Sequence, residues 1–181
     1  MKLHLDIYFV KYDLKELINN LFKSSGKSAD IWGTYSSNGN KIEIYYIPLI
    51  LFCQIYSLPL EHAIISTLVH EMAHAYHHIG RDKDNVTWTK MFETDNRIVE
   101  GMAEYFTWLF VETYKYNHPG MSKTYESMFD CLGDEYTIFK SWTPAYNKET
   151  IKSALLGTRK KSIKDYGEFI TLLQEVKKIM H

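Results

Sequence analysis

The chain has 181 residues, of which 45% are hydrophobic and 24% are charged, and this composition suits one globular domain with a substantial core. The formal net charge of −1 lacks the basic excess that nucleic-acid-binding domains carry, so a nucleic-acid partner is not expected. Cys53 and Cys131 are too few for a disulfide framework or a four-cysteine zinc site, and a reducing, cytoplasmic location fits best.

The N-terminal residues are predicted to form a helix and not a targeting segment. The apolar run within residues 1–10 is short and is interrupted by Asp6, which argues against a signal peptide. Over residues 12–26 apolar side chains recur at helical spacing, and Asp13 with Glu16 makes a capping-box pattern at the start. We therefore expect the first element to be a helix.

A β-hairpin is predicted over residues 31–47. Two runs with period-two alternation are separated by Asn38 and Gly39, which form a turn signal. The second strand covers residues 41–46 and is expected to end before Pro48, because proline cannot donate a hydrogen bond to a sheet.

Helical patterns dominate the remainder of the chain. An apolar stretch over residues 47–60 contains prolines and is too short to span a membrane, so no membrane partner is expected. Pro59 suits the start and Gly80 the end of one long helix, while Thr94 or Asp95 suits the N-cap of another. The predicted helical segments are 59–80, 94–116, 123–133, 148–157 and 162–180. This order indicates an α+β fold, mainly helical, with a small antiparallel hairpin before the long helix.

Four of the eight histidines fall within nine residues of the long helix, although histidine is costly to bury without a partner. His70, Glu71 and His74 spell H-E-x-x-H. Residues at i and i+4 share one face of a helix, so the two imidazoles can bind one metal ion while Glu71 reaches a water molecule beside it. The alternative is a polar stripe of histidines on the surface of an amphipathic helix. The residues expected to face the core are Ile64, Ile65, Leu68, Val69 and Met72.

The helix predicted over residues 94–116 offers a third ligand. Glu100 and Glu104 are also four residues apart, so one carboxylate can bind the metal while the other accepts a hydrogen bond from a ligating histidine. Gly101 costs about 1 kcal/mol in a helix relative to alanine, and close packing against the H-E-x-x-H helix would explain its presence. The alternative is a pair of solvent-facing glutamates on an amphipathic helix.

These motifs resemble those of the gluzincin branch of zinc metallopeptidases, in which H-E-x-x-H is joined by a glutamate ligand from a later helix. The stretch Val99–Met102 is similar to the N-E-G-F-like segment of the aminopeptidase members, which makes Glu100 the implied third ligand. The thermolysin-like members have a second acid four residues later, which matches Glu104. The resemblance covers roughly residues 41–110 and implies a zincin-like fold, with residues 41–46 as an edge strand that receives an extended peptide.

Two neighbouring families share part of this pattern. Residues 58–76 resemble the SprT-like proteases that act on DNA-bound proteins, but those use a third histidine and usually a cysteine zinc ribbon. Here no histidine follows His78 until His118. Residues 70–78 also resemble the ImmA/IrrE-type regulators, which cleave or release repressors. The metzincin pattern fails, because Gly80 stands where it requires histidine.

The resemblance to gluzincins implies zinc-dependent hydrolysis of a peptide or protein substrate. His70, His74 and Glu100 would bind Zn²⁺, Glu71 would act as the general base, and Glu104 would orient a histidine. A set of two histidines and one carboxylate also suits other divalent ions, non-haem iron included. The alternative is a regulatory protein of the same fold that binds zinc without turnover.

The chain is expected to form one domain over residues 1–181, with a catalytic core over 30–117 and a helical part over 118–181. Larger gluzincins use a tyrosine or histidine to stabilise the oxyanion of the transition state. The candidates here are Tyr136, Tyr146 and His118. The C-terminal residues 175–181 are a candidate cover for the site, which would bring His181 near the metal.

Overall fold

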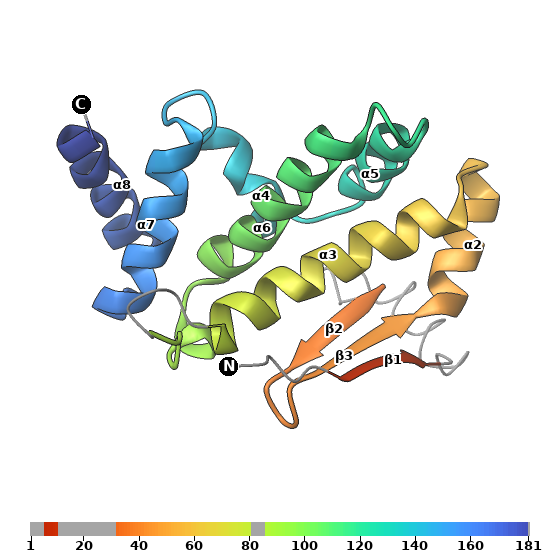
Figure 1. The fold of residues 1–181 in the computed structure, drawn as a ribbon, viewed down its shortest axis with the longest axis horizontal. Coiled ribbons are helices and arrows are strands. Elements are labelled where there is room, and N and C mark those ends of the chain that lie inside the picture. The colour runs from red at the N-terminus through yellow and green to blue at the C-terminus, as the bar shows by residue number, and fades with distance from the viewer. Residues whose placement is uncertain (1–5, 11–31, 81–85, 181) are drawn as a thin grey trace.

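The computed structural model describes residues 6–10, 32–80 and 86–180. Its strands are β1 (Asp6–Val10), β2 (Gly33–Ser36) and β3 (Lys41–Tyr45). Its α-helices are α2 (Tyr46–Tyr56), α3 (Leu60–Ile79), α4 (Asn96–Tyr114), α5 (Met121–Phe129), α6 (Asp134–Thr137), α7 (Lys148–Lys161) and α8 (Tyr166–Met180), and its 3₁₀ helices are η1 (Met91–Glu93) and η2 (Ile138–Ser141). The predicted α+β, mainly helical fold is confirmed (Figure 1), while the helix predicted over residues 12–26 lies outside the described residues. None of the described helices is long and apolar enough to cross a membrane.

The three strands form one sheet in the order β1-β3-β2. β2 and β3 are the arms of the predicted hairpin and pair antiparallel, with Thr34 opposite Glu43. The turn between them holds Gly39 at φ 83° and Asn40 at φ 51°, which glycine and asparagine tolerate better than most residues. The prediction that residues 41–46 form an edge strand is wrong, because β1 pairs in parallel with the other side of β3. The edge strand that contacts α3 is β2.

The segment after β3 is a helix that no sequence pattern predicted. Its residues are apolar on nearly every side and therefore lack the spacing that marks an amphipathic helix. β3 ends at Tyr45, before Pro48 as predicted, but α2 begins immediately at Tyr46. Pro48 lies in the first turn of α2, where its missing N–H removes no intrahelical hydrogen bond.

Helix α3 lies between the sheet and α4 (Figure 1). Its polar side is the buried side, formed by His62, Ser66, Thr67, His70, Glu71, His74 and His77. The prediction that the apolar side faces the core holds only in part. Ile64, Ile65 and Leu68 are half-buried and pack against the core, whereas Val69 is half-buried and Met72 is 46% exposed. The alternative of a histidine stripe on the surface is wrong, because α4, α5 and the sheet pack against α3 and enclose that stripe.

Helix α4 carries the two glutamates. Asp95 caps its N-terminus by accepting a hydrogen bond from the Arg97 N–H at 2.9 Å. The close packing at Gly101 is not with α3 as predicted, but with Ile138 and Trp142. A Cβ at this position would lie 2.6 Å from Ile138 Cγ2 and 2.8 Å from Trp142 Cη2. The glycine therefore permits the close approach of η2 and Trp142 to α4.

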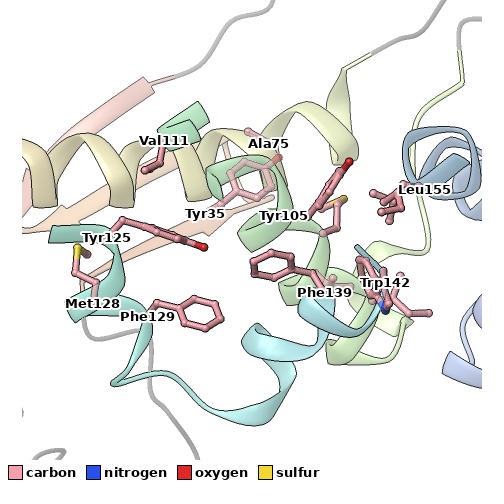
Figure 2. Close-up of a cluster of buried hydrophobic side chains, with 14 of the residues drawn as sticks. Tyr35, Ala75, Tyr105, Val111, Tyr125, Met128, Phe129, Phe139, Trp142 and Leu155 are labelled. Carbon is pink, nitrogen blue, oxygen red and sulfur yellow. The ribbon is translucent and has the colours of Figure 1, made fainter. Parts of the chain in front are cut away.

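Aromatic and methionine side chains fill much of the core around α4 and α5 (Figure 2). The ring of Phe139 lies with its centroid 6.3 Å from that of Tyr105 and 5.7 Å from that of Phe129. Beyond this core α7 and α8 pack together, and Thr150 Oγ1 lies 3.9 Å from Met180 Sδ. The predicted C-terminal cover is therefore wrong as far as Met180, because this segment packs on α7; His181 lies outside the described residues.

Candidate metal centre

Three side chains from α3 and α4 converge. His74 Nε2 lies 3.0 Å from His70 Nε2, and Glu100 Oε2 lies 3.2 Å from His70 Nε2 and 3.3 Å from His74 Nε2. The two histidines are one turn apart on α3, and Glu100 faces them from the N-terminal half of α4. Within the described part of the chain, this is the only group of three such residues whose ligand atoms could hold a metal ion. Glu100 and Glu104 are therefore not a solvent-facing pair.

The geometry and chemistry of these three residues fit a metal ion such as zinc. Bonds of about 2.0–2.1 Å at tetrahedral angles place ligand atoms roughly 3.4 Å apart, close to the 3.0, 3.2 and 3.3 Å between these atoms. Imidazole nitrogen and carboxylate oxygen are both ligands of zinc, and three protein ligands leave a fourth position open. The same set also suits other divalent ions, iron included.

When no metal ion is bound, His70 and Glu100 shift the pKa of each other. Burial lowers the pKa of His70, but its hydrogen bonds with Glu100 and Glu104 outweigh burial and raise the pKa well above the usual value. Burial raises the pKa of Glu100, but the charges of His74 and His70 outweigh it and hold the pKa well below the usual range. Both shifts favour a protonated His70 beside an ionised Glu100 when no metal ion is bound, and a divalent cation that binds His70 would displace that proton.

Glu104 contacts His70 on the side opposite to the convergence point. Its Oε1 accepts a hydrogen bond from His70 Nδ1 at 2.9 Å, which leaves Nε2 directed toward Glu100 and His74. Tyr125 of α5 donates a hydrogen bond to Glu104 Oε2 at 3.0 Å. The four-residue spacing of Glu100 and Glu104 predicted the role of Glu104, but no local pattern marked Tyr125. His74 Nδ1, in contrast, is buried with no hydrogen-bond partner among the described residues.

A pocket opens beside His70, with about 600 Å³ of empty space when its open mouth is included. Its apolar wall includes Trp32, Met128, Phe129 and Leu132. His70 and Glu71 line its polar end. Glu71 lines the pocket and is only 5% exposed, so it is largely withdrawn from bulk solvent. A molecule in the pocket would therefore meet both a candidate metal ligand and the candidate general base.

The edge strand β2 lies close to Glu71 because residue 33 is glycine. A Cβ on Gly33 would lie 2.7 Å from Thr67 Cγ2 and 3.2 Å from Glu71 Cγ. A larger residue would push the strand away from α3. No sequence pattern singled out Gly33, since its role depends on which strand lies against α3.

Only one of the three oxyanion candidates lies at the site. The Tyr136 ring centroid is 5.9 Å from that of His70, and Tyr136 lines the pocket. His118 instead lies beside His62, with ring centroids 6.3 Å apart, and His62 precedes His70 by about 12 Å along the helix. Tyr146 lies under the Lys177 ammonium of α8, 5.5 Å from its ring centroid. Neither His118 nor Tyr146 contributes to this pocket.

Comparison of the chain with protein-family models, curated proteins and solved structures finds no match. The likeness to gluzincins therefore rests on the H-E-x-x-H motif, on the downstream glutamates and on the contacts that these residues make. Those contacts define a group that could hold a metal ion; the identity of the metal and the reaction are matters for proposal.

Proposed function

We propose that the chain is a zinc-dependent metallopeptidase of the gluzincin type. In this proposal His70, His74 and Glu100 bind the metal and Glu71 is the general base. The observation that carries it is the convergence of three ligand atoms from His70, His74 and Glu100, one of which, His70, lines a pocket together with Glu71. H-E-x-x-H with a glutamate from a later helix is typical of a metal site that keeps one position open for a reacting water.

In the proposed peptide hydrolysis the metal, Glu71 and Tyr136 each have a separate role. Bound zinc would act as a Lewis acid that polarises the scissile carbonyl and makes a water molecule more acidic. Glu71 accepts a proton from the attacking water and returns it to the leaving amine. Its burial strengthens the interaction of its charge with nearby groups. Tyr136 stands on the pocket side of His70, where a phenolic hydroxyl can stabilise the oxyanion that forms from the carbonyl.

A peptide or a protein is the proposed substrate. β2 pairs with β3 on one side, and none of the described strands pairs with its other side. Backbone groups on such an edge can form hydrogen bonds with an extended peptide. Gly33 brings this edge close to Glu71, so a peptide bound along β2 would pass the general base. An apolar side chain of that peptide would suit the pocket wall formed by Trp32 and Met128.

The first experiment combines metal content with peptide hydrolysis. Wild type and Glu71→Gln are expected to bind one zinc ion per chain, and Glu100→Ala to lose it. Hydrolysis of a fluorogenic peptide library should fall at least about a hundredfold in Glu71→Gln, because general acid–base catalysis contributes roughly 10²–10⁴-fold. Glu112→Gln is the matched control, since Glu112 lies on α4 and pairs with Lys115.

Each other outcome has a definite meaning. A Glu71→Gln protein that cleaves peptides at the wild-type rate would contradict the general-base role. A wild-type protein that binds zinc and cleaves no peptide would favour a regulatory zinc-binding protein. Wild type that binds neither zinc nor another divalent metal would overturn the metal site itself.

A further inference from the structure

A chain of hydrogen bonds connects three helices behind the metal ligands. Tyr125 of α5 donates to Glu104 Oε2 at 3.0 Å, and Glu104 Oε1 of α4 accepts from His70 Nδ1 of α3 at 2.9 Å. Resting on the proposed function, we infer that Tyr125 is a positioning residue for the metal site. Through Glu104 it holds the His70 ring in the tautomer and orientation that present Nε2 to the metal.

The hydrogen bond from Tyr125 to Glu104 is important because both residues are buried. Glu104 is 5% exposed and Tyr125 is 6% exposed, so bulk solvent has little access to the hydrogen bond to Oε2, although both residues line the inner wall of the pocket. A buried carboxylate is stabilised when both of its oxygens have donors, and a missing donor costs more inside a protein than at its surface. Two donors on opposite oxygens also define the plane of the carboxylate, and this plane determines how Oε1 meets His70.

The Tyr125 hydroxyl is suited to be a permanent donor. Burial and the negative charge of Glu104 raise the pKa of Tyr125 above its usual value, so the hydroxyl keeps its proton. The ring is held separately by packing, with its centroid 5.7 Å from that of Phe129 (Figure 2). Tyr125→Phe therefore removes the hydrogen bond and leaves the ring contacts in place.

The test measures the zinc dissociation constant by competition with a chromophoric chelator. Tyr125→Phe is expected to bind zinc about tenfold more weakly than wild type, because loss of a group that orients a ligand typically costs 10–100-fold in metal affinity. Tyr105→Phe is the matched control, since the Tyr105 hydroxyl is buried without a hydrogen-bond partner in the described part of the chain. Its zinc affinity should equal that of wild type. The absorption spectrum of the cobalt-loaded protein should change in Tyr125→Phe alone.

A second background separates positioning from simple destabilisation. In a Glu104→Gln protein the charged acceptor that Tyr125 serves is gone, so adding Tyr125→Phe should weaken zinc binding by a smaller factor than it does in the protein that keeps Glu104. This pair also keeps the test open if Tyr125→Phe alone does not fold, because an amide left without the hydroxyl is less costly than an unpaired carboxylate.

The outcomes distinguish this inference from the proposed function. Three results would each overturn the role of Tyr125 and leave the zinc site standing. They are zinc binding by Tyr125→Phe equal to wild type, an equal loss in Tyr105→Phe, and a loss from Tyr125→Phe that is as large in the Glu104→Gln background as in the protein that keeps Glu104. Wild type that binds no zinc would overturn the proposed function and this inference together.

Discussion

His77 has the lowest exposure of the histidines on α3, at 2%, and neither ring nitrogen has a hydrogen-bond partner among the described residues. Its ring packs with its centroid 5.1 Å from that of Phe106 and 6.3 Å from that of Trp88. Burial, followed by the positive charge of Arg159, lowers the pKa of His77 to about 3. His77 is therefore neutral near neutral pH and fills the core.

Acid should destabilise the chain through this residue. An unfolded histidine titrates near pH 6.5, whereas His77 in the folded chain titrates near 3. Between these values the unfolded state binds the proton and the folded state does not, so the free energy of unfolding falls as the pH falls. The contribution of His77 between pH 7 and pH 5 is on the order of 2 kcal/mol. Denaturant unfolding of metal-free protein should therefore show a smaller loss over this range in His77→Leu than in wild type.

The control for this prediction is His118→Gln, because His118 is an exposed histidine. That variant should lose the same stability as wild type between the two pH values. The other titrating groups are common to wild type and His77→Leu, so the difference between these two proteins isolates His77. An equal pH dependence in His77→Leu and wild type would contradict the prediction.

At the scale of the elements, Gly101 permits η2 and Trp142 to pack against α4. Alanine is the better helix former by about 1 kcal/mol, but its Cβ would lie 2.6 Å from Ile138 Cγ2. Overpacking a core costs about 1–3 kcal/mol. Gly101→Ala should therefore lower the free energy of unfolding, which chemical denaturation would measure.

Gly157 of α7 provides the matched comparison. A Cβ there would meet Leu172 Cδ2 at 3.1 Å, at the movable end of a flexible side chain. Helix propensity should prevail in Gly157→Ala, so its stability should equal or exceed that of wild type. The packing account of Gly101 fails if the two alanine variants have the same stability.

At the scale of the whole molecule, the metal ligands join α3 and α4, two helices that pack against each other near the centre of the fold (Figure 1). An ion that binds only the folded chain stabilises it by about 2.7 kcal/mol at a hundredfold excess over its dissociation constant. Zinc should therefore raise the Tm of wild type, and a chelator should reverse the rise. Calorimetry should show no zinc-dependent shift in Glu100→Ala; an equal shift in that variant would place zinc elsewhere.

Elements with a strong local pattern were predicted correctly from the sequence. The hairpin followed from alternation around Asn38-Gly39, and the two long helices followed from their apolar spacing and end signals. α2 was missed because its apolar run has no distinct polar face. The edge strand was assigned to β3 instead of β2, because the partner on the other side of β3 comes from a distant part of the chain.

In the candidate site too, local sequence patterns predicted some features and tertiary packing determined the others. The sequence by itself determined that His70 and His74 share a helical face and that Glu100 and Glu104 can act as a pair, because helical geometry sets the direction of residues four apart. Only the tertiary structure decided that the histidine face is buried, that Gly101 packs against Trp142 and that Tyr125 reaches Glu104. These contacts join residues from different helices, and their formation depends on how whole elements pack, which no local spacing encodes.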